Sequence, residues 1–84
     1  MVAVTMASYE LDARNLLCPL PVIRTQAKIK ELSEGDTLTV ICTDPGALHD
    51  IPAWCRVNGH DLLETQEANK EISITVKVGE PSLF

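Results

Sequence analysis

The spacing of the apolar residues switches repeatedly along this chain between the alternation typical of a strand and the three-to-four spacing of a helix. The alternation is cleanest where Ile72, Ile74 and Val76 are separated by polar residues, so this segment should turn one apolar face to a core. Asn69 opens a short turn before that segment, which predicts a tight hairpin. The predicted strands are 4–12, 36–43, 60–68 and 71–78, and the predicted helices are 19–33 and 45–58.

This order of elements predicts an α/β fold, a two-layer α/β sandwich of the form βαβαββ. Both helices would cover one face of a four-stranded mixed sheet, since right-handed crossovers place them on the same side. The pattern leaves the order of the strands within the sheet open. The 84 residues are predicted to form a single domain, with 79–84 as a mobile tail.

Proline marks the start of both predicted helices. Pro19 and Pro45 suit the first helical position, where a missing N–H costs nothing and the fixed φ fits. Asp44 directly precedes Pro45 and can cap the second helix. Pro52 falls inside that helix, so we expect either a kink there or a new helical segment capped by Asp50.

Cys18 precedes the first of these prolines. Pro19 disfavours the helical conformation for Cys18 and favours the extended geometry of an N-cap residue, where a helix dipole promotes ionisation of a thiol. Pro19 and Pro21 have no N–H, which leaves the Leu20 N–H as the main donor, so we predict a modest lowering of the Cys18 pKa. The two prolines should also keep the first turn rigid. The alternative is that Cys18 is a small buried apolar residue, as free cysteines often are.

Cysteine usage and charge argue against several functional classes. Cys18, Cys42 and Cys55 are odd in number and show no Cys-x-x-Cys spacing, so neither a dithiol redox motif nor a zinc knuckle is supported. Cys42 falls in phase with Leu38 and Val40 and is predicted to lie in the core.

The net charge of −5 disfavours nucleic acid as the main ligand. Without a basic leader or a stretch of transmembrane length, a reducing cytoplasm is the expected compartment.

Several short motifs carry a resemblance to a known family. They are Leu11-Asp12-Ala13-Arg14, Leu17-Cys18-Pro19-Leu20-Pro21, Thr43-Asp44-Pro45, and Asp50-Ile51-Pro52 followed by Trp54 and Cys55. Together they resemble the TusA (SirA-like) sulfur-carrier proteins over about residues 11–78. The sequence departs from that family at Asn15, where glycine is usual. Asparagine is the best substitute for glycine at a positive φ, so the turn should survive.

The resemblance implies a small cytoplasmic sulfurtransferase without a cofactor, with Cys18 as its catalytic residue and with Pro19 and Pro21 shaping the site. In that family the cysteine accepts sulfane sulfur from a cysteine desulfurase or a rhodanese, holds it as a persulfide and passes it to an acceptor protein. The pathways served are tRNA thiolation, molybdenum-cofactor supply and sulfur oxidation. The implied fold is similar to the C-terminal domain of translation initiation factor 3.

Contacts with partner proteins are expected around Cys18. Leu20 and Ile23 lie off the main apolar stripe of the first helix, and they are either edges of the core or an apolar docking rim. Arg24 and Lys28 either face solvent or contact a partner. Asp44 starts the second helix and would lie on the same rim. No direct nucleic-acid contact, no membrane contact and a monomeric state are expected.

Two other functions are consistent with the residues alone. One is a non-catalytic binding or regulatory module, for instance on RNA, although a stripe of interleaved basic and aromatic residues is missing. The other is a thiol redox protein that pairs Cys18 with Cys55. His49 and His60 show no metal-ligand spacing, so they are interpreted as a solvated helix residue and a strand-edge residue, and no metal is expected.

Overall fold

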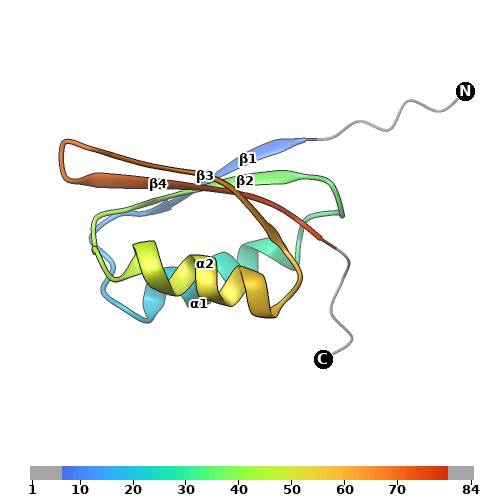
Figure 1. The fold of residues 1–84 in the computed structure, drawn as a ribbon, viewed down its shortest axis with the longest axis horizontal. Helices are drawn as coiled ribbons and strands as arrows, with labels where there is room; N and C mark the ends of the chain where they lie inside the picture. The colour runs from blue at the N-terminus through green and yellow to red at the C-terminus, as the bar shows by residue number, and fades with distance from the viewer. Residues whose placement is uncertain (1–6, 80–84) are drawn as a thin grey trace, which may run out of the picture.

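The computed structural model describes residues 7–79, and over this range it confirms the two-layer α/β sandwich (Figure 1). Both helices lie side by side against one face of the four-stranded mixed sheet. The predicted strand residues before Ala7 and the predicted tail beyond Gly79 lie outside the described residues. The elements are β1 (Ser8–Ala13), α1 (Leu20–Ile29), β2 (Thr37–Cys42), α2 (Ala47–Val57), β3 (Asp61–Ala68) and β4 (Glu71–Lys77).

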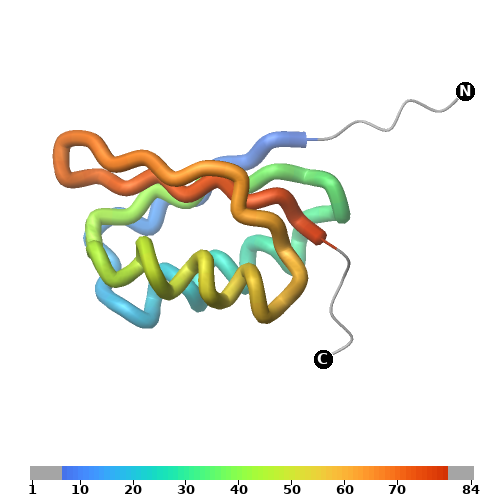
Figure 2. The backbone as a smooth tube through the Cα atoms, in the orientation of Figure 1, coloured from blue at the N-terminus to red at the C-terminus, as the bar shows by residue number. Residues whose placement is uncertain are grey.

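The strands lie in the order β1-β2-β4-β3. β1 and β2 are parallel, whereas β4 pairs antiparallel with both β2 and β3. The last strand therefore lies between β2 and β3, and the connection through α2 passes over it. Both helices begin at the end of the molecule where the β3–β4 turn lies, as the backbone trace shows (Figure 2). The two loops that precede the helices consequently meet at that end.

The β3–β4 hairpin contains the predicted tight turn. Asn69 and Lys70 have φ values of 52° and 66°, as a type I′ turn requires at both central positions. The pairing register shifts between Leu62 and Glu64, so Leu63 is an extra residue in β3. This irregularity explains why the sequence does not alternate cleanly there. β3 forms an edge of the sheet, and all its residues are exposed.

The core lies between the sheet and the helices. Leu38, Val40 and Cys42 of β2 are fully buried, which confirms Cys42 as a core residue. Thr25 of α1 is also buried, and its hydroxyl donates a hydrogen bond to the Pro21 carbonyl at 2.8 Å, so the polar group is satisfied within its own helix. The other buried apolar residues are Ala13, Ile29, Ala47, Ile51, Cys55, Ile72, Ile74, Val76 and Val78.

Both helices are shorter than predicted. α1 ends at Ile29, and α2 begins at Ala47 without Asp44 as its N-cap. α2 runs unbroken through Pro52, because packing of its buried face holds the helix together across the one hydrogen bond that proline removes. The predicted second segment capped by Asp50 is therefore wrong. Within residues 7–79, no helix is long and apolar enough to cross a membrane.

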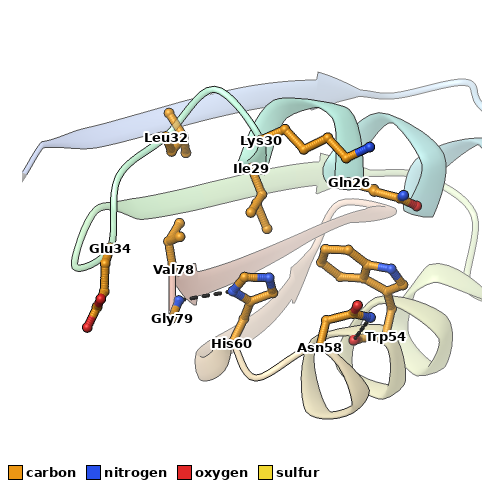
Figure 3. Close-up of a pocket in the computed structure, with 10 residues that line it drawn as sticks. All are labelled: Gln26, Ile29, Lys30, Leu32, Glu34, Trp54, Asn58, His60, Val78 and Gly79. Atoms are coloured by element: carbon orange, nitrogen blue, oxygen red, sulfur yellow. Dashed lines mark hydrogen bonds between the residues drawn. The ribbon is translucent and has the colours of Figure 1, made fainter. Parts of the chain in front are cut away.

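His60 joins the end of α2 to the sheet, and it is not the strand-edge residue that we predicted. Its ring stacks on Trp54 with the centroids 5.2 Å apart, and its Nδ1 accepts a hydrogen bond from the Gly79 N–H at 3.0 Å (Figure 3). A Cβ at Gly79 would overlap the Gly59 carbonyl, so the close approach of these two segments requires glycine. Burial lowers the pKa of His60 because the cation is poorly solvated in this position. His49, by contrast, is exposed on α2, as predicted.

Acidification should therefore destabilise the fold through His60. The unfolded chain binds a proton there near the ordinary pKa of 6.5, whereas the folded chain resists it, so stability falls as the pH drops through that value. Urea unfolding at about pH 7.5 and about pH 5.5 should show this loss, and His60→Gln should reduce it. His49→Gln is the matched control and should retain the loss. An undiminished pH dependence in His60→Gln would contradict the assignment.

Candidate functional site

Cys18 lies in the loop between β1 and α1, and its side chain is exposed. α1 begins at Leu20 with Pro19 in the N-cap position, and the Cys18–Pro19 peptide bond is cis. Cys18, which we predicted to be the N-cap itself, thus lies one residue before the N-cap, and Pro19 is the cap rather than the first helical residue. The alternative in which Cys18 is buried as a small apolar residue is wrong.

The loop between β2 and α2 holds the Cys18 loop through two hydrogen bonds. The Asp44 Oδ2 accepts from the Cys18 N–H at 2.8 Å, and the Thr43 Oγ1 accepts from the Asn15 N–H at 2.9 Å. Asn15 has a φ of 63°, which confirms the positive φ expected at this position. The Asp44 Oδ1 also accepts from the Gly46 N–H at 3.1 Å. Asp44 therefore joins the loops that precede both helices, although it does not cap α2.

Asp50 contacts the sulfur itself. The Cys18 thiol donates a hydrogen bond from Sγ to the Asp50 Oδ2 at 2.7 Å. Asp50 lies in the first turn of α2, which places its carboxylate at the end of the sandwich where the Cys18 loop lies. Sequence reasoning assigned Asp50 a capping role and missed this contact. The sequence offered one indication of this contact. Asp50 belongs to a motif that resembles the TusA family, and it lies early in a helix that was predicted to start near Cys18.

This environment overturns the predicted lowering of the Cys18 pKa. The hydrogen bond to Asp50 raises the pKa of the Cys18 thiol, and desolvation and the negative charges of Asp50 and Asp44 act in the same direction. The Leu20 N–H, which we expected to stabilise the thiolate, donates to the Leu17 carbonyl at 2.8 Å instead. Two carboxylates therefore outweigh the partial positive charge of the helix end.

The other two cysteines differ from Cys18 because they are buried. Cys42 and Cys55 have no exposed surface, and burial raises the pKa of each to about 11. All three cysteines are free. Of the three cysteines, Cys18 is therefore the one exposed thiol, and the observed burial of Cys55 argues against its pairing with Cys18.

Three large apolar side chains near Cys18 in the sequence are exposed. Leu17, Leu20 and Ile23 are 73 %, 43 % and 51 % exposed, and we call these three residues the apolar rim. They are large apolar residues close in sequence to Cys18 that the core does not use. Arg24 is exposed beside them, whereas Lys28 is half-buried with its Nζ 5.5 Å from the centroid of the Tyr9 ring. Lys28 is thus engaged with β1 rather than free on the surface.

A cavity of about 230 Å³ lies at the opposite end of the helices (Figure 3). Trp54 and His60 form an aromatic wall of this cavity, and Gln26 of α1 and Lys30, which follows α1, also line it. It contains neither the Cys18 thiol nor the carboxylates of Asp44 and Asp50. In the part of the chain from residue 7 to residue 79, no group of three or more His, Cys, Asp or Glu side chains could hold a metal ion.

Comparison with known proteins agrees with this geometry. The family model described as "Sulfurtransferase TusA" matches residues 9–78. The chain belongs to the TusA family. It is 38 % identical over 68 residues to the sulfur carrier protein TusA of Allochromatium vinosum, covering 81 % of this chain and 90 % of that protein. It is 47 % identical over 57 residues to the sulfur carrier protein TusA of Pseudomonas aeruginosa, covering 68 % and 72 %.

The fold of this TusA-family chain also matches a solved structure. The crystal structure of the SirA-like protein from Desulfitobacterium hafniense superposes with a TM-score of 0.76 at 28 % sequence identity. The match covers 86 % of this chain and 99 % of that one. The resemblance to TusA and SirA-like proteins that the sequence motifs indicated is therefore confirmed.

Replacement of Asp50 should make Cys18 more reactive. Asp50→Asn removes the charged acceptor, so the pKa of the thiol should fall and iodoacetamide should alkylate it faster than in the wild type at neutral pH. The pH–rate profile, followed by intact mass, should move to lower pH. Asp44→Asn should move it less, because Asp44 acts on the thiol through its charge alone. An identical profile in Asp50→Asn and the wild type would refute the role of this carboxylate.

Proposed function

We propose that this TusA-family protein is a sulfurtransferase of the carrier type, which accepts sulfane sulfur on Cys18 as a persulfide and relays it to an acceptor protein. The observation that carries the proposal is the presentation of Cys18. It is the one exposed thiol of the chain, and two hydrogen bonds from a neighbouring loop hold its own loop in place. The names of the relatives support the same role.

The chemistry needs one nucleophilic sulfur. In the loading step the Cys18 Sγ attacks the outer sulfur of a donor persulfide, R–S–SH. A bond forms between Sγ and that sulfur, the donor S–S bond breaks, and the donor leaves as a thiolate that takes up the proton released by Cys18. Asp50 lies where that proton departs. Delivery to the acceptor is the same exchange, with the acceptor thiolate attacking the outer sulfur of the loaded carrier.

The first turn of α1 suits this exchange. Pro19 fixes the backbone directly after the cysteine, and Pro21 is buried at the second helical position. The loop cannot easily fold back over the sulfur, because both residues have a restricted φ. These two prolines shape the site by keeping Cys18 accessible to the sulfur atoms of two different partners in turn.

Donor and acceptor are proposed to be proteins. A cysteine desulfurase or a rhodanese would load Cys18, and the acceptor would belong to tRNA thiolation, molybdenum-cofactor synthesis or sulfur oxidation. Docking would use the apolar rim together with Arg24, which is exposed next to Ile23 on α1, and Asp44, whose carboxylate accepts from the Cys18 N–H. Lys28 is a weaker candidate because of its contact with Tyr9. The protein would work as a monomer in a reducing cytoplasm, without contacting nucleic acid or membrane itself.

Intact mass spectrometry tests the carrier role directly. The protein is incubated with a cysteine desulfurase and cysteine, and separately with a rhodanese and thiosulfate. The expected result is a gain of one sulfur atom that dithiothreitol removes, and that Cys18→Ser does not show. The donor that loads it distinguishes a biosynthetic pathway from sulfur oxidation. If neither donor adds sulfur while Cys18 remains free to react with iodoacetamide, the proposal fails.

The apolar rim should contribute to loading by a protein donor. Ile23→Glu places a charge on the rim, and it should lower kcat/KM for loading by about tenfold, as expected for a buried interface side chain. Val57→Glu is the matched control, because Val57 is 84 % exposed and lies about 10 Å along α2 from Asp50. Alkylation of Cys18 by iodoacetamide should be unchanged in both variants. Equal losses in the two variants would argue against docking through the rim.

A further inference from the structure

We propose that Asp50 stabilises the unloaded form of Cys18 selectively, and so determines how readily the carrier gives its sulfur away. This inference rests on the proposed function, and it adds a role that the persulfide chemistry alone does not require. The geometry that carries it is the 2.7 Å hydrogen bond from Sγ to the Asp50 Oδ2. A carboxylate near the start of a helix is otherwise free to point into solvent, whereas this one meets the reacting atom.

The hydrogen bond can exist only before loading. In the free thiol, Sγ carries a hydrogen and donates it to the carboxylate. In the persulfide, Sγ is bonded to Cβ and to the outer sulfur and carries no hydrogen. The proton, if present, lies on the outer sulfur. Loading therefore exchanges a charge-assisted hydrogen bond for a carboxylate that faces sulfur lone pairs.

The loss of this contact has two consequences. The equilibrium of sulfur transfer shifts towards the unloaded carrier, because only that state gains the bond to Asp50. The outer sulfur is also repelled from the carboxylate, most strongly when the persulfide is ionised, and so turns towards the open side of the loop. A carrier with both properties would release sulfur to an acceptor readily and would not retain it.

Asp44 provides a natural comparison within the same site. Its two carboxylate oxygens accept from the Cys18 and Gly46 backbone N–H groups, which loading of the sulfur does not alter. Asp44 also contributes a negative charge that acts on the thiol, more weakly than Asp50, but it makes no bond to the thiol hydrogen. Asp44→Asn therefore controls for the loss of one charge, whereas Asp50→Asn removes both a charge and the charged acceptor.

The test is a competition for sulfur between two copies of the chain. Wild-type protein, uniformly labelled with ¹⁵N, is loaded with inorganic polysulfide and mixed with an equal amount of unloaded, unlabelled variant. Trace glutathione carries sulfur between the copies. The exchange is wild-type–S–SH + variant–SH ⇌ wild-type–SH + variant–S–SH. Intact masses give the four concentrations, and the mixture is also prepared with the variant loaded first to establish equilibrium.

Asp50→Asn should hold sulfur about tenfold more strongly than the wild type in this competition, as the loss of a partly exposed charged hydrogen bond predicts. Asp44→Asn removes a charge but no bond to the thiol hydrogen, so it should raise the constant less than Asp50→Asn does, relative to unlabelled wild type against labelled wild type. Asp50→Ala should reproduce Asp50→Asn, with folding of each variant checked by circular dichroism. A constant for Asp50→Asn no larger than that for Asp44→Asn would overturn the proposal.

The competition experiment distinguishes a wrong role for Asp50 from a wrong carrier function. Polysulfide loads an accessible thiol without any donor protein, so the competition reports on Asp50 even if no desulfurase or rhodanese recognises the chain. Conversely, normal loading by a donor protein together with an exchange constant near one would keep the carrier role and remove the role of Asp50.

Discussion

The site depends on the Asp44 carboxylate. One of its oxygens accepts from the Cys18 N–H and the other from the Gly46 N–H, so a single side chain joins the loops that precede the two helices. The parallel pairing of β1 with β2 makes this possible, because it brings the carboxyl ends of both strands to one edge of the sheet. Such edges are where α/β folds commonly place their binding sites. Cys18 thus lies on a loop whose position the sheet determines.

Two opposing electrostatic effects act on the Cys18 thiol, and the larger one determines the direction in which its pKa shifts. A helix end contributes roughly half a positive charge, spread over several N–H groups and screened by solvent. Here prolines and the Leu17 carbonyl reduce even that contribution. Asp50 bears a full negative charge within hydrogen-bonding distance of Sγ. The resulting thiol is less ionised than an unperturbed one.

Predictions from the sequence were most successful for features that depend only on residues close together in the chain. The alternation along β4, the turn at Asn69 and the positive φ at Asn15 depend on near neighbours, and all were predicted. The strand order was not, because the position of β4 depends on pairing between distant segments. Asp50 was misassigned for the same reason. It lies 32 residues from Cys18, and helix-capping rules consider only its neighbours.

Burial gives the three cysteines their different chemistry. Cys42 is the last residue of β2, so it directly precedes the loop that holds Cys18, yet its side chain points into the core. Cys55 is buried on α2, the same helix whose Asp50 bonds to the Cys18 thiol. Burial raises the pKa of both above that of an ordinary thiol and denies them access to any partner. Cys18 is therefore the one cysteine of the three that lies exposed, and the residue that faces its sulfur is a carboxylate rather than a second thiol.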